Sequence, residues 1–164
     1  MKRRIYIFVY LIMFTLPCFS QCKKEVQTNE TFIDFSFITP DKKQLTLSDI
    51  QTNYILLYFY NPECEHCAEI KKKLSKNDKL NFMIENNKLT IIAILPDVQK
   101  EYWLQNTEFI PENWKNGWCE NDKLIVKAYL KKVPTFFLLD NQRKILNCSD
   151  EKTFKAILKD IDDE

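Results

Sequence analysis

Residues 54–67 read YILLYFYNPECEHC and combine the two features that decide the fold. The first seven residues form a near-continuous apolar and aromatic run, which is typical of a central strand that is covered on both faces. Asn61 and Pro62 follow, and this pair predicts a helix start with the asparagine as N-cap and the proline in the first turn. The segment therefore predicts a buried strand that leads directly into a helix carrying a Cys-x-x-Cys motif.

The cysteines of this motif, Cys64 and Cys67, have the spacing of a redox-active pair. In the first helical turn, unpaired backbone N–H groups and the helix dipole favour the thiolate form of Cys64. Cys67 lies on the same helical face, close enough to close a small disulfide ring. We expect Cys64 to attack a partner's disulfide and Cys67 to resolve the mixed disulfide. His66 adds a donor, and when protonated a charge, near the Cys64 sulfur, and Glu65 opposes it.

The rest of the chain alternates between strand and helix patterns and shows no internal repeat. Alternation of this kind predicts one α/β domain with a parallel sheet core and helices on both faces, to which a final hairpin adds antiparallel strands. The other strands are predicted at residues 32–37, 44–47, 89–95, 114–119, 133–139 and 144–148. The other helices are predicted at residues 98–106, 124–130 and 153–161.

The composition excludes several classes of function. With one glycine, Gly117, the chain cannot build a glycine-rich phosphate loop, and with one histidine, His66, it lacks the ligands of an ordinary zinc hydrolase. Lys and Arg total 24 against 23 Asp and Glu, so no global basic field favours nucleic acid. We therefore expect no cofactor, no metal site and no nucleic-acid partner.

The N-terminus has the pattern of an export signal. A basic cluster at residues 2–4 precedes an apolar run at residues 5–16, which is too short to span a bilayer. We predict a signal peptide at residues 1–20, a flexible tether at 21–31 and the domain at 32–164. Cleavage after Ser20 and lipidation of Cys22 both remain open, so the mature protein is expected in the periplasm or cell envelope, with a possible lipid anchor at Cys22.

A second motif, Val133-Pro134-Thr135, opens a predicted strand. Proline has no N–H for a sheet ladder, so it belongs at a strand start or an irregular joint. A cis Val133–Pro134 bond would turn the Val133 backbone towards the disulfide and present hydrogen-bonding groups to an extended substrate.

Together these motifs resemble the TlpA-like branch of the thioredoxin superfamily, a group of exported bacterial thiol–disulfide oxidoreductases. The similarity extends over residues 32–161 and includes the opening hairpin in 35–49 and the helix and strand in 97–119. It implies a thioredoxin-like three-layer sandwich with a central mixed sheet, an N-terminal β-hairpin and an inserted helix-strand unit. It also implies that Cys64 attacks, that Cys67 resolves and that Pro134 is a cis-proline.

The chain departs from this family's pattern at two places. Pro62 and Glu63 stand where many relatives have a tryptophan before the first cysteine, and Tyr58 stands where thioredoxins keep a buried acid. We expect these changes to alter the substrate-facing surface and to send protons through water, Glu63 or Glu65.

Three functions are compatible with these residues. We expect an enzyme that exchanges disulfides with exported proteins and that depends on an unidentified upstream redox partner. The first alternative is a non-catalytic binding or assembly module of the envelope, in which Cys64 and Cys67 only staple the fold, and the second is a copper chaperone. Cys119 and Cys148 either form a disulfide with each other or fill the core as small apolar residues. The simplest interpretation of four aromatic residues is that they pack in the core, and the alternative is an apolar surface for client proteins; they are Trp103, Phe109, Trp114 and Trp118.

Overall fold

The computed structural model of the chain describes residues 28–149. The predicted signal peptide, Cys22, most of the predicted tether and the predicted helix at residues 153–161 lie outside this part of the chain. In chain order the elements are β1 (Ser36–Ile38), β2 (Gln44–Thr46), β3 (Tyr54–Phe59), α1 (Glu65–Ser75), α2 (Asp78–Glu85), β4 (Leu89–Ile94), α3 (Lys100–Gln105), β5 (Lys115–Gly117), α4 (Lys123–Tyr129), β6 (Thr135–Asp140) and β7 (Ile145–Ser149).

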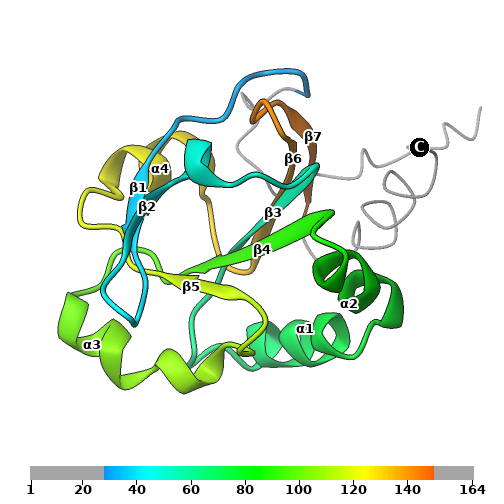
Figure 1. Cartoon of the computed structure of the whole chain (residues 1–164). Helices are drawn as coiled ribbons and strands as arrows, with labels where there is room; N and C mark the ends of the chain where they lie inside the picture. The colour runs from blue at the N-terminus through cyan, green and yellow to red at the C-terminus, as the bar shows by residue number, and fades with distance from the viewer. Residues whose placement is uncertain (1–27, 150–164) are drawn as a thin grey trace, which may run out of the picture.

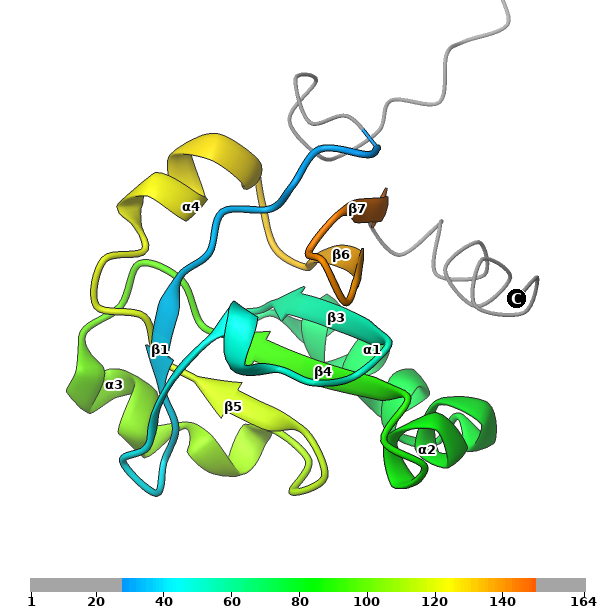
Figure 2. The same ribbon diagram turned by 45° about the horizontal axis from the view of Figure 1, so that its top comes forward.

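The central strand is β3, and all six of its residues are buried. Side chains alternate across a strand, so β3 contributes to two separate cores. Leu56 and Tyr58 pack in one core with residues of α1, α2 and α3, whereas Ile55 and Leu57 pack in the other with residues of α4 and β1. The sheet is therefore the middle layer of three, as Figures 1 and 2 show from two directions.

The sheet is mixed and has the order β5-β4-β3-β6-β7. β3 pairs in parallel with β4, and β4 pairs in parallel with β5. On its other side β3 pairs antiparallel with β6, which pairs antiparallel with β7. This arrangement confirms the α/β fold with a parallel core and a final antiparallel hairpin that the sequence predicts.

The N-terminal hairpin is also confirmed. β1 and β2 form a separate antiparallel pair, and Ile38 joins the main sheet through a bridge to Trp118, just after β5. Phe32, which precedes the hairpin, stacks on Tyr129 of α4 with ring centroids 4.0 Å apart. The hairpin and α4 consequently cover the sheet face opposite to α1.

Two local predictions need correction. Asn61 is not the N-cap of the first helix, because α1 begins at Glu65 and its N-cap is Cys64. The carbonyl-bearing Asn61 side chain instead accepts a hydrogen bond from the Glu63 N–H at 2.8 Å, which closes a turn ahead of the helix. The helix α2 is not among the predicted helices; it begins where the Asn77 side chain accepts a hydrogen bond from the Leu80 N–H at 3.0 Å.

None of the helices within residues 28–149 combines the length and the hydropathy that a bilayer span requires.

Candidate active site

The Cys64-Glu65-His66-Cys67 motif lies where the carboxyl end of β3 leads into α1. Cys64 occupies the N-cap position with extended backbone angles, φ −88° and ψ 108°. Its Sγ accepts a hydrogen bond from the Cys67 N–H at 3.3 Å, in the place where an asparagine or serine oxygen usually caps a helix. The sulfur thus contacts one of the unpaired N–H groups of the first turn, an arrangement that stabilises negative charge on it. Cys64 thus lies just before the first turn and not within it, where the sequence analysis had placed it, and the predicted preference for its thiolate form stays a prediction.

The two thiols differ sharply in burial. Both are free cysteines in this structure, Cys64 is half-buried and Cys67 is fully buried. The pKa of the Cys67 thiol is raised to about 12, chiefly by burial and next by a hydrogen bond with Cys64. A backbone hydrogen bond from Asn61 and a hydrogen bond from Tyr58 act the other way and lower this pKa. Cys67 is therefore a protonated thiol at neutral pH while Cys64 faces the surface.

Val133 and Pro134 lie at the same end of the sheet as the cysteine motif. The Val133–Pro134 peptide bond is cis, which confirms the prediction. Phe59, the last residue of β3, pairs with Thr135, the first residue of β6, so the cis bond lies level with the loop that carries Cys64. Val133 and Cys64 also pack against the same hydrophobic core. Contact of the Val133 backbone with a substrate stays a prediction.

His66 lies on the outer side of the first turn of α1. Its side chain is 43% exposed, and its Nδ1 lies 4.0 Å from the Oε2 atom of Glu69, one turn along the helix. The imidazole is thus placed to pair with a carboxylate when it is protonated. Its predicted support for the Cys64 thiolate stays a prediction.

The loop before Cys64 is fixed by a residue that the sequence analysis did not single out. Tyr102 of α3 donates a hydrogen bond from its hydroxyl to Oε1 of Glu63 at 2.8 Å. This hydrogen bond raises the pKa of the Tyr102 phenol. Because 39 residues separate the two partners, no sequence pattern links them. Glu63, which stands in place of the tryptophan of many relatives, therefore ties the motif to the inserted helix.

Beneath the motif lies a column of stacked aromatic rings on the α1 side of the sheet. Consecutive ring centroids are 4.9 Å apart for Phe136 and Tyr58, 5.5 Å for Tyr58 and Tyr60, and 5.2 Å for Tyr60 and Phe109. Lys71 closes the column, since its Nζ lies 3.6 Å from the centroid of the Phe109 ring and donates to the Phe109 carbonyl at 2.6 Å. Through Lys71 and the stacked rings, the first two turns of α1 are packed firmly against the sheet.

A family model described as thioredoxin-like matches residues 51–145, more than half of the chain. The chain belongs to the thioredoxin-like family. This confirms the family that the cysteine motif and the cis-proline motif predict. The matched segment runs from just before β3 to the start of β7, so it includes both motifs.

Several solved structures share this thioredoxin-like fold. A conserved protein of unknown function from Bacteroides fragilis is 25% identical, with a TM-score of 0.74 over 83% of this chain and 99% of that one. A thioredoxin-like protein from Bacteroides caccae is 24% identical, with a TM-score of 0.76 over 84% of this chain but only 50% of that one. The thioredoxin domain of a thiol-disulfide oxidoreductase from Bacteroides vulgatus is 19% identical, with a TM-score of 0.66. No curated protein matches the chain.

The remaining cysteines of this thioredoxin-like domain do not pair with each other. Cys119 is a buried free thiol and Cys148 is disulfide-bonded, so the Cys119–Cys148 disulfide that the sequence left open is absent. Cys119 fills the core as a small apolar residue, and burial raises the pKa of its thiol. Within residues 28–149, no three His, Cys, Asp or Glu side chains come together as a metal site.

The aromatic residues around α3 are mainly core, as the simplest interpretation predicts. Trp103 and Trp114 are buried, and the Trp103 Nε1 donates to Oδ1 of the buried Asn116 at 2.8 Å. Phe109 and Trp118 are partly buried and pack against the same core. They hold α3 and β5 to the sheet, and thereby hold Tyr102 near the cysteine motif.

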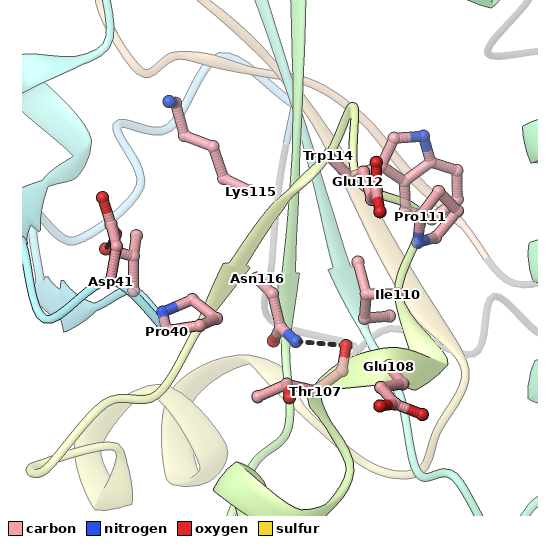
Figure 3. Close-up of a pocket in the computed structure, with 11 residues that line it drawn as sticks. Pro40, Asp41, Thr107, Glu108, Ile110, Pro111, Glu112, Trp114, Lys115 and Asn116 are labelled. Carbon is pink, nitrogen blue, oxygen red and sulfur yellow. Dashed lines mark hydrogen bonds between the residues drawn. The ribbon is translucent and has the colours of Figure 1, made fainter.

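A surface pocket of about 660 Å³ lies beside this aromatic core. It is enclosed by the turn of the β1–β2 hairpin, which includes Pro40 and Asp41, and by the segment 107–116 (Figure 3). None of the predicted site residues lines it. Trp114 forms part of its wall and contacts Tyr58 edge-on with centroids 6.1 Å apart.

Proposed function

We propose that this protein is an exported thiol–disulfide oxidoreductase that exchanges disulfides with other exported proteins through Cys64 and Cys67. The observation that carries the proposal is the asymmetry of the pair: a half-buried sulfur caps the helix, and a fully buried thiol lies one turn behind it. An inert staple needs no such difference between its two sulfurs. A nucleophile and a resolving thiol do need it.

In the reductive direction the reaction has two exchanges. The Cys64 thiolate attacks a client disulfide, so a Cys64–client disulfide forms and the second client sulfur leaves as a thiolate, which takes a proton from water. Cys67 then loses its proton and attacks the Cys64 sulfur, which forms the Cys64–Cys67 disulfide and releases the client thiolate. Two electrons pass to the client in total, and an upstream dithiol must supply them to regenerate the pair. The oxidative direction is the reverse sequence.

The pairing of β3 with β6 supports a place for the client. Val133 precedes β6, whose first residue pairs with the last residue of β3, so its backbone lies at the same end of the sheet as the cysteine loop, where an extended client segment can add hydrogen bonds. The basic head and short apolar run of residues 1–20 support export, and disulfide chemistry persists outside the cytoplasm. The client is an exported protein that carries a disulfide, and the upstream partner is a dithiol.

Catalysed reduction of insulin by a small dithiol tests the proposed enzyme. We expect the wild-type protein to accelerate the reduction, and the Cys64→Ser protein to leave it at the uncatalysed rate. Equal rates with wild-type and Cys64→Ser protein, together with equal rates in the reverse assay that oxidises a reduced client, would exclude catalysis. The binding or assembly module would then be the better account of the chain.

A further inference from the structure

Tyr58 lies directly beneath the first turn of α1 and is locked in one position. Its ring is fully buried and stacks between Phe136, at an interplanar angle of 6°, and Tyr60, at 25°. Trp114 contacts it edge-on at 87°. With three aromatic neighbours the ring cannot turn away without opening the core, so its hydroxyl keeps a fixed place.

That fixed place is at the resolving cysteine. The Tyr58 hydroxyl donates a hydrogen bond to the Cys67 carbonyl oxygen at 2.9 Å. The same hydroxyl also acts on the Cys67 side chain, where it lowers the pKa of the thiol against the larger effect of burial. Tyr58 therefore reaches both the backbone and the sulfur of Cys67 from the interior of the domain.

The other groups that act on the Cys67 sulfur are the Cys64 thiol and the backbone of Asn61. Tyr58 is not a base at neutral pH, because burial raises the pKa of its phenol far above its ordinary value. In the mixed disulfide the Cys64 sulfur is bonded to the client, and a backbone amide is not a base, so neither of these two takes the proton of Cys67. The charged and titratable groups on the elements around Cys67 are directed elsewhere or lie at the surface. They are Glu63 with Tyr102, Glu65, His66 with Glu69, and Lys71 with Phe109. The phenol of Tyr60 is buried, and burial raises its pKa, so it is no base at neutral pH.

Resting on the proposed function, we propose that Tyr58 is a positioning residue for the resolving step, whose hydroxyl holds the first turn of α1 and stabilises the Cys67 thiolate as it forms. The proton of Cys67 passes to water. The thiolate then attacks the Cys64 sulfur of a mixed disulfide, the Cys64–Cys67 bond forms, the bond from Cys64 to the leaving group breaks, and that group departs as a thiolate. With no internal base, the rate of this step rises about tenfold for each pH unit below the pKa of Cys67.

A small aromatic disulfide, dithiobis(nitrobenzoate), separates this step from the attack. Reduced protein releases one coloured thiolate when Cys64 attacks and a second when Cys67 resolves, so stopped-flow absorbance records two phases. All variants carry Cys→Ala substitutions at Cys18, Cys22, Cys119 and Cys148, because reduction also opens the disulfide of Cys148, and only the two thiols of the motif then remain. The Cys67→Ser variant identifies the second phase by removing it. The reagent needs no client, so the assay is independent of the proposed function.

In the Tyr58→Phe protein we expect the second phase to slow by about tenfold or more, because a hydrogen bond to a charged group is lost, while the first phase keeps its rate. Tyr60→Phe is the matched control. It belongs to the same column, its hydroxyl is buried, and that hydroxyl has no hydrogen-bond partner among the described residues. We expect both phases to be unchanged in this variant, and the wild-type second phase to rise about tenfold per unit from pH 7 to pH 9.

Four results would overturn the assignment of Tyr58: an unchanged second phase in Tyr58→Phe, equal slowing of both phases, equal slowing by Tyr60→Phe, or a wild-type second phase that stops rising in this pH range. The pH dependence is measured on the wild-type motif, so it tests the assignment even if the Tyr58→Phe protein does not fold. If the phases behave as expected while insulin and client turnover are absent, the proposed function fails and the role of Tyr58 stands.

Discussion

Cys64 and Cys67 should differ in alkylation rate by orders of magnitude when each is left alone by a Cys→Ser substitution of its partner. Burial is the largest cause of the raised pKa of Cys67, about 12, and it persists in the Cys64→Ser protein. An unperturbed cysteine has a pKa of about 8.5, and each pKa unit changes the thiolate fraction about tenfold near neutral pH. The thiolate of Cys67 is therefore about three thousandfold scarcer than that of an ordinary exposed cysteine. Limited access to the buried sulfur slows its reaction further.

The assay is iodoacetamide labelling of folded Cys64→Ser and Cys67→Ser proteins between pH 7 and pH 9, with the label assigned to each cysteine by peptide mass mapping. Cys119 serves as an internal reference, since it is also buried and burial also raises the pKa of its thiol. We expect Cys64 to react at least about a hundredfold faster than Cys67 at pH 7, and Cys67 to react faster with every increase in pH. Comparable rates for Cys64 and Cys67, or a Cys67 rate that levels off below pH 9, would refute the reasoning.

Two further predictions concern the packing that holds the site. In Gly117→Ala, the new Cβ would lie 2.7 Å from Cδ1 of Ile94 and 2.7 Å from Cδ2 of Phe37, so we expect a loss of about 1–3 kcal/mol in the free energy of unfolding, measured by urea denaturation. An unchanged urea midpoint would show that the hairpin is less tightly packed on β5 than described. In Trp103→Phe, Asn116 loses its indole donor and the core loses volume, so we expect a cost of about 2–4 kcal/mol. A cost below about 1 kcal/mol would contradict this contribution.

Regular elements with strong local patterns were predictable from the sequence. The run at residues 54–60 became β3, and the similar run at 89–95 became β4, because unbroken apolar segments of this length are buried on both faces wherever they pair. The cis-proline required the family resemblance, since X-Pro bonds are mostly trans. The helix α2 was missed although Asn77 offered a capping signal, because α1 and α2 are separated by only two residues and their patterns merge.

Features that depend on packing between distant segments were not predictable. The N-cap of α1 fell on Cys64 because the Asn61 side chain is engaged by the Glu63 N–H, a choice that the local sequence leaves open. The hydrogen bond from Tyr102 to Glu63 depends on where α3 docks. The sequence marked Tyr58 only as a departure from the family's buried acid. Its contact with the Cys67 carbonyl depends on how α1 lies across β3.

The central claim is that Cys64 attacks client disulfides and Cys67 releases them, and trapping of mixed disulfides tests it most directly. Cys67→Ser and Cys64→Ser proteins are produced with their native N-terminus in a host that exports them, and each is purified after acid quenching and thiol blocking. On non-reducing gels we predict that Cys67→Ser carries disulfide-linked proteins that disappear on reduction, and that Cys64→Ser carries few or none. Absence of such adducts from both variants, or equal amounts on the two, would contradict the account.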